Sequence, residues 1–85
     1  MQGWKARMNN LKVEQDKVKV QLKKEIYLKR AVLLACEAFS ESCWVGLSAN
    51  EESYKIELRP KQAGIELENL GYEFCNFVLG IMQNV

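Results

Sequence analysis

The sequence predicts a two-layer α+β sandwich with the element order β-α-β-β-α, and three patterns lead to this prediction. Residues 17–23 alternate between polar and apolar side chains, two short alternating runs follow at residues 43–48 and 54–59, and helical apolar periods occupy residues 25–39 and 65–85. A chain of 85 residues has room for one domain with a single hydrophobic core. We therefore expect an irregular lead-in over residues 1–10 and one α+β domain over residues 11–85.

The first strand is predicted from Val18, Val20 and Leu22, which alternate with lysine and glutamine as in a strand with one buried face. The alternation could begin as early as Leu11, but the polar residues 15–17 interrupt its phase and indicate a turn or a bulge. The two later runs are joined by the short polar link 49–53 and therefore predict an antiparallel hairpin, which Pro60 closes.

The helices are predicted from apolar residues that recur at steps of three and four. The first helix is expected from Glu25, with Tyr27, Ala31, Leu34, Ala35, Ala38 and Phe39 on its buried stripe. The last helix is expected from an apolar stripe that continues nearly to the end of the sequence and consists of Ile65, Leu67, Leu70, Phe74, Phe77, Val78, Ile81 and Val85.

The topology follows from connection rules. A right-handed crossover makes the first two strands parallel, and the hairpin strand fits between them in an antiparallel orientation. The expected architecture is a three-stranded sheet of order 1-3-2 with both helices on one face and the other face open.

The composition argues against catalysis. There is no histidine, which removes Ser-His and Cys-His nucleophile pairs and histidine metal ligands. Cys36, Cys43 and Cys75 show no metal-ligand spacing and are expected to be reduced thiols in a cytoplasmic protein. We expect no enzymatic activity, no cofactor and no metal.

Membrane association and nucleic-acid binding are not expected either. The chain has neither an apolar run long enough to span a membrane nor a secretory signal. The net charge of +1 differs from the strongly basic balance of nucleic-acid binders, although basic residues gather in the first 24 positions.

Two surfaces are candidates for binding a partner. Trp44 and Arg59 are expected on the open sheet face, where one tryptophan among cations is also compatible with single-stranded RNA binding. The last helix is expected to extend beyond the sheet and to expose Phe77, Ile81 and Met82. This stripe predicts a homodimer or an obligate hetero-complex formed through the C-terminal half of that helix.

Three stretches of the sequence, read together, resemble the His-Xaa-Ser system protein HxsD family. The first stretch runs from Glu25-Ile26-Tyr27 through Ala31 to Ala38-Phe39-Ser40-Glu41-Ser42-Cys43-Trp44-Val45, the second is Ile56-Glu57-Leu58-Arg59-Pro60-Lys61, and the third is Glu73-Phe74-Cys75-Asn76. The resemblance covers roughly residues 18–80. Trp44 stands where the family pattern has Tyr, and Cys75 stands where it has Leu.

The resemblance implies a small accessory protein of a bacterial peptide-modification system with radical SAM enzymes and a precursor peptide rich in His-Xaa-Ser repeats. This chain lacks the CxxxCxxC signature of a radical SAM enzyme. The expected function is therefore that of a non-catalytic adaptor that binds the modifying enzyme or the precursor peptide. The alternative is a single-stranded RNA-binding module that uses the open sheet face.

Overall fold

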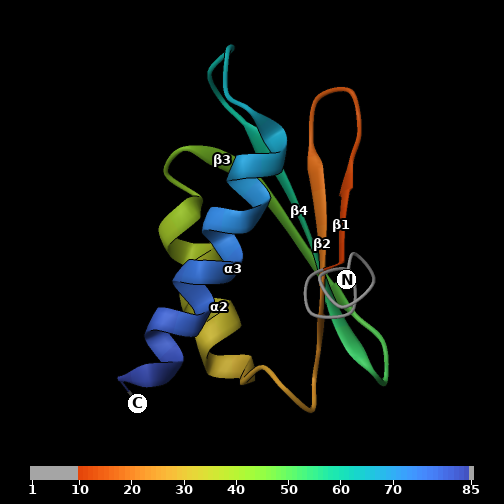
Figure 1. Cartoon of the computed structure of the whole chain (residues 1–85), viewed down its shortest axis with the longest axis vertical. Coiled ribbons are helices and arrows are strands. Elements are labelled where there is room, and N and C mark those ends of the chain that lie inside the picture. Colours follow the sequence, from red (N-terminus) through yellow and green to blue (C-terminus); the bar gives the residue numbers. More distant parts are fainter. Residues whose placement is uncertain (1–9, 85) are drawn as a thin grey trace, which may run out of the picture.

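In the computed structural model, which describes residues 10–84, four strands form one sheet and two helices cover one of its faces (Figure 1). The strands are β1 (Asn10–Val13), β2 (Val18–Lys23), β3 (Cys43–Ala49) and β4 (Ser53–Pro60), and the helices are α2 (Lys29–Phe39) and α3 (Leu67–Gln83). The predicted α+β class is confirmed. The predicted lead-in lies outside the described residues except for Asn10, which begins β1.

The prediction of a three-stranded sheet is wrong because β1 adds a fourth strand. The Glu14 amide donates to the Lys17 carbonyl at 2.8 Å and closes a hairpin, so the polar break at residues 15–17 is a turn. Leu11 then lies opposite Val20 in an antiparallel ladder. The sheet order is β1-β2-β4-β3, in which β4 pairs antiparallel with both β2 and β3.

The core lies between the sheet and the helices. Alternate residues of the two central strands are fully buried because β2 and β4 have neighbours on both sides and helices above them. The largest fully buried side chain is Phe74 of α3, which packs among these strand residues. The buried set includes Val18, Val20, Leu22, Ile56, Leu58, Phe74, Cys75 and Val78.

Helix α2 begins at Lys29 rather than at Glu25. The amides of Ile26 and Tyr27 both donate to the Lys23 carbonyl, which forms a turn at the end of β2. Tyr27 is buried, as expected, but it lies in this turn, before the first residue of α2. Leu34, which the period places on the buried stripe, is exposed, because the helix turns its small residues Ala31 and Ala35 toward the core.

Helix α3 extends through Gly80 to Gln83, and Gly64, with φ of 85°, lies in the turn that precedes it. The left-handed conformation at Gly64 is one that glycine adopts at little cost. Gly71 on α3 faces β1 and β2, and a Cβ there would lie 3.1 Å from methyl groups of both Leu11 and Val18. The missing side chain lets the helix approach the hairpin that the sequence did not predict.

Candidate functional site

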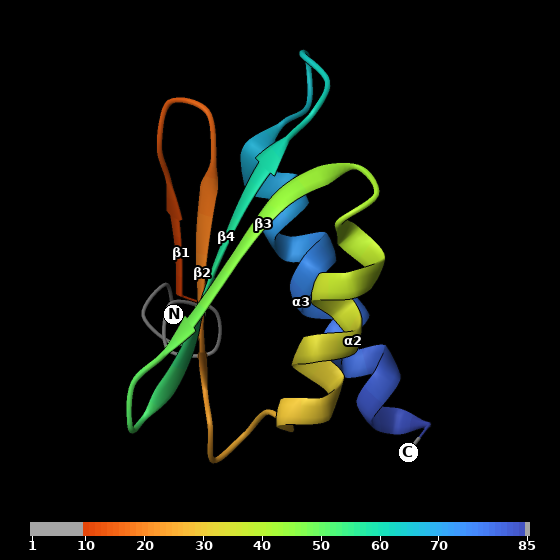
Figure 2. The same ribbon diagram turned by 180° about the vertical axis from the view of Figure 1, so that it is seen from behind.

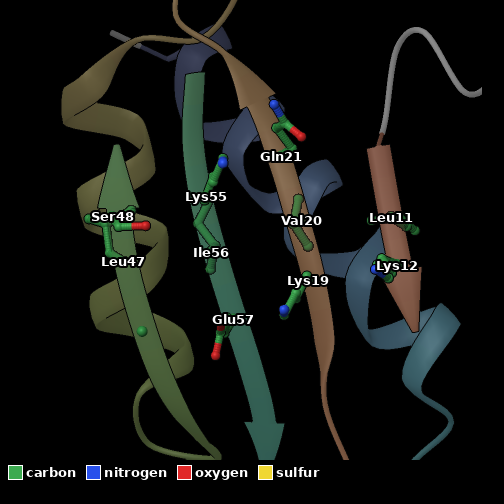
Figure 3. A pocket seen from close by; sticks show the side chains of 11 residues that line it. Leu11, Lys12, Lys19, Val20, Gln21, Leu47, Ser48, Lys55, Ile56 and Glu57 are labelled. Atoms are coloured by element: carbon green, nitrogen blue, oxygen red, sulfur yellow. The ribbon is translucent and has the colours of Figure 1, made fainter. Parts of the chain in front are cut away.

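The open face of the sheet carries most of the strand lysines. Figure 3 shows Lys19, Gln21, Lys55 and Glu57 on the two central strands, with the helices behind the sheet. They line a shallow hollow of about 630 Å³ whose floor includes Gly46. No aromatic side chain stands on this face of β2 or β4, so the two central strands offer no platform for base stacking.

Ion pairs neutralise much of this basic face. Lys17 lies 3.2 Å from Glu57, Lys19 lies 3.4 Å from Glu14, and Arg59 contacts Asp16 at 3.2 Å. The acidic residues of the β1–β2 turn thus serve as counter-ions for the strand cations. Each of these ion pairs reduces the positive charge that a nucleic-acid backbone would meet on this face.

The structure brings the predicted residues Trp44 and Arg59 together, since they are register partners on β3 and β4. Trp44 is 63% exposed, and the Lys61 ammonium lies 4.6 Å from the centroid of its ring. Lys61 also donates to the Ser40 carbonyl at 3.0 Å, at the C-terminus of α2. Three of the positions that carry the family resemblance, Trp44, Lys61 and Ser40, therefore form one cluster.

The structure places the other predicted partner residues on α3, away from Trp44. Phe77 is 43% exposed, and its ring meets Phe39 edge to face with centroids 5.5 Å apart. Ile81 and Met82 are half-buried and pack against the core. Less of this stripe reaches solvent than the sequence suggests, and self-association through α3 stays a prediction.

The edge of the sheet formed by β3 presents unpaired backbone groups. Hydrogen bonds from the Asn50 amide to the Ser53 carbonyl and from the Lys61 amide to the Ser42 carbonyl fix the phase of the β3–β4 ladder. In this phase the even-numbered residues of β3 bond to β4, and the odd-numbered residues direct N–H and C=O outward. These residues, which have no backbone partner among residues 10–84, are Cys43, Val45, Leu47 and Ala49.

The two edges of the sheet differ in their protection. Strand β1 has four residues and carries Lys12, and short, charged edges resist pairing with other chains. Strand β3 has seven residues, CWVGLSA, with no charge and no proline. Within residues 10–84, β3 is therefore the less protected of the two edges.

Helix α2 lies next to this edge (Figure 2). Between α2 and β3 there is a hollow of about 250 Å³ that is mostly apolar. Leu33 and Leu47, 44% and 41% exposed, contribute to its walls. The lining residues are Lys29, Val32, Leu33, Leu47, Ser48, Ala49 and Tyr54.

Sequence reasoning missed this hollow. Leu33 falls outside the apolar stripe of α2, and Leu47 has the phase of a buried strand residue. One signal was present, namely the run of seven uncharged residues in β3. Only its position at the edge of the sheet makes that run accessible.

The cysteines have the environment of structural thiols. Burial raises the pKa of the Cys36 thiol to about 11 and that of the Cys75 thiol to about 11. Nucleophilic cysteines instead have a lowered pKa. Cys43 is buried at the start of β3, and all three cysteines are free.

Within residues 10–84, no group of three or more Cys, Asp or Glu side chains is arranged to hold a metal ion. Over the same residues, neither helix combines the length and the hydropathy that crossing a bilayer requires.

Comparison of the chain with protein-family models, with curated proteins and with solved structures finds no significant match. The resemblance to the HxsD family therefore stays a prediction.

Proposed function

We propose that this protein is a non-catalytic adaptor that binds an extended segment of a protein partner, either a peptide-modifying enzyme or the precursor peptide of that enzyme. The observation that carries the proposal is the free edge of β3, seven uncharged residues long. An extended segment that pairs with this edge gains main-chain hydrogen bonds and continues the sheet. The family resemblance supports the same kind of partner.

The surroundings of the edge favour a protein segment over RNA. Backbone amides and carbonyls that point outward from β3 match the repeat of an extended polypeptide. On the open face, by contrast, Trp44 stands on the outermost strand, and its ring is occupied by Lys61. We therefore propose a protein segment as the ligand and include single-stranded RNA in the experiment as the competing ligand.

The experiment compares two variants of the same edge residue. Leu47→Pro removes an outward N–H that takes no part in the β3–β4 ladder, and Leu47→Val keeps that N–H with a similar loss of side-chain volume. Each protein is co-expressed with the products of neighbouring genes, and the mass of the complex is measured by light scattering. A synthetic peptide of His-Xaa-Ser repeats and a single-stranded oligouridine are titrated in parallel.

We expect a defined partner or the repeat peptide to bind the natural protein and Leu47→Val, and to bind Leu47→Pro at least about tenfold more weakly. Circular dichroism establishes that both variants are folded. A complex that tolerates Leu47→Pro as well as Leu47→Val would overturn the proposal. Salt-sensitive binding of oligouridine without any bound protein segment would replace it with the RNA-binding function.

A further inference from the structure

We infer that the segment added to β3 runs antiparallel to it and carries an acidic residue two positions before a bulky apolar residue. This inference rests on the proposed use of the β3 edge and adds the chemistry that the edge selects. Three features determine it: the outward hydrogen-bonding phase of β3, the apolar hollow beside it, and the positive end of α2.

The phase of β3 determines where the side chains of the added strand point. Leu47 and Ala49 direct their backbone groups outward and their side chains toward the helix layer. In a hydrogen-bonded antiparallel pair, opposed residues have their side chains on the same face. Every second residue of the segment therefore points toward α2, and the residues between them stand on the Trp44 side of the sheet.

The residue opposite Leu47 points into the hollow between α2 and β3. Its walls are the side chains of Val32, Leu33, Leu47 and Tyr54, and its volume of about 250 Å³ accommodates one leucine-sized or phenylalanine-sized group. Leu33 and Leu47 would lose their exposure to water on such binding. An apolar side chain is therefore preferred at this position of the segment.

The residue opposite Ala49 lies beside the N-terminus of α2, where Lys29 lines the same hollow. The first turn of α2 contains Lys29 and Arg30 and no acidic residue, and the N-cap Leu28 makes no side-chain capping bond. Cations at the positive end of a helix are unfavourable, and a carboxylate there offsets both the helix dipole and the two cations. An acidic side chain fits this position.

The order of the two residues follows from the direction of the segment. All strand pairs of this sheet are antiparallel, and antiparallel ladders are somewhat more stable per residue than parallel ones. A strand that runs opposite to β3 passes Ala49 before Leu47. The selected pattern is therefore acidic-Xaa-apolar in the N-to-C direction.

The test uses synthetic extended peptides with Glu-Xaa-Leu, Leu-Xaa-Glu, Lys-Xaa-Leu or Glu-Xaa-Ser at the centre of one constant host sequence. Binding to the full chain and to Lys29→Glu is measured by fluorescence anisotropy of the labelled peptides. Glu-Xaa-Leu is expected to bind most tightly. Replacing its leucine by serine should weaken binding more than about tenfold, since the transfer of a leucine side chain out of water is lost.

Charge reversal provides the specific readout. Lys29→Glu should weaken the Glu-Xaa-Leu peptide about two- to fivefold and strengthen the Lys-Xaa-Leu peptide by a similar factor, as expected for an exposed ion pair. The matched control is Lys55→Glu, which reverses a lysine on the open face away from the hollow and should leave the preference unchanged. N-methylation of every second peptide residue should abolish binding when the methylated amides are those that pair with β3. It should leave binding unchanged when they are the amides that point away from β3.

Four results would overturn the inference or the proposed function on which it rests. Equal binding of all four peptides, or a preference for Leu-Xaa-Glu, contradicts the acidic-Xaa-apolar order. If Leu47→Pro still abolishes partner binding in that case, the proposed function stands without this inference. Insensitivity to Leu47→Pro contradicts the proposed function itself. A dimer of the free protein that Leu47→Pro dissociates, while Ile81→Glu with Met82→Lys leaves it intact, assigns the edge to a second copy of the chain.

Discussion

Phe39 of α2 and Phe74 of α3 meet edge to face, with ring centroids 5.2 Å apart and an interplanar angle of 74°. This pair joins the two helices above the sheet. Phe39 makes a second contact of the same kind with Phe77, at 5.5 Å. The two partners of Phe39 differ in environment, since Phe74 is fully buried and Phe77 is 43% exposed.

We expect Phe74→Ala to lower the free energy of unfolding by about 3–5 kcal/mol, because it opens a cavity at the centre of the core. Phe77→Ala removes the same number of atoms and one aromatic contact, but from a half-exposed site, and should cost only about 1–2 kcal/mol. Urea denaturation of both variants provides the measurement. Equal losses would show that the core is not centred on Phe74.

Gly71 and Gly80 give a matched pair on α3. A Cβ at position 71 would meet Leu11 and Val18 at 3.1 Å, whereas a Cβ at position 80 would have no atom within 4 Å. Gly71→Ala should therefore cost about 1–3 kcal/mol through overpacking, which the higher helix propensity of alanine offsets by up to about 1 kcal/mol. Gly80→Ala should stabilise it by up to about 1 kcal/mol, since alanine is the better helix former.

Thermal unfolding followed by circular dichroism measures both effects. Amide exchange of residues 10–13 should accelerate in Gly71→Ala and remain unchanged in Gly80→Ala, because only the first variant disturbs the contact between α3 and β1. A Gly71→Ala protein as stable as the natural one, with unaltered exchange in β1, would contradict the packing of Leu11 on this helix.

Asn50 closes the β3–β4 hairpin through its side chain. Its Oδ1 accepts hydrogen bonds from the Glu52 and Ser53 amides, each at 2.8 Å, and Ser53 is buried. Asn50→Ala leaves the buried amide without its acceptor and should cost about 1–3 kcal/mol. Asn50→Asp keeps the acceptor and should cost less, as chemical denaturation can determine. A larger loss in the aspartate variant would show that charge repulsion from Glu51 and Glu52 outweighs the turn.

The thiols of Cys75, which is buried, and Cys36, which is half-buried, predict how stability depends on pH. The pKa values of Cys36 and Cys75 are raised by burial from 9.0 to about 11, and the pKa of Tyr27 is also raised by burial. Above pH 9 the unfolded thiols lose protons while the folded ones retain them until about pH 11. This stabilising contribution is fully present below pH 9 and is lost as the pH rises through about 11.

The Tm should therefore fall between pH 9 and pH 11. In a Cys36→Ala, Cys75→Ala double variant, the fall should be smaller, although its Tm at pH 7 is lower. In the folded natural protein, iodoacetamide at pH 8 should modify Cys36 and Cys75 far more slowly than in urea, as mass spectrometry can follow. Rapid modification of Cys75 in the folded protein would contradict its burial.

The fold could be predicted from the sequence wherever one residue period covers a complete element. The alternation of Val18, Val20 and Leu22 predicts the buried face of β2, and the period through Leu70 and Phe74 predicts the face of α3 that packs on it. The error at β1 has a local cause. A hairpin turn and a bulge within one strand would both interrupt the alternation at residues 15–17, so the sequence does not distinguish them. The structure has a turn, which makes Leu11 and Val20 cross-strand partners.

The candidate site was less predictable because it depends on contacts between distant segments. Val45 and Leu47 show the same alternation as Ile56 and Leu58, yet they are more exposed since, among residues 10–84, β3 has a neighbouring strand on one side only. Similarly, the helical period places Leu34 on the buried stripe of α2 and Leu33 outside it. Both leucines are exposed, because Ala31 and Ala35 occupy the side of the helix that faces the core.

By itself the sequence determined which residues alternate, which recur along a helix, and that Phe74 lies in the core, because these properties depend on the geometry of single elements. Only the tertiary structure decided that β3 is the less protected edge and that Lys29 and Ala49 line one hollow. The physical reason is that sheet order and helix placement follow from how elements pack onto one another. A residue period carries information about one face of one element and none about its neighbours.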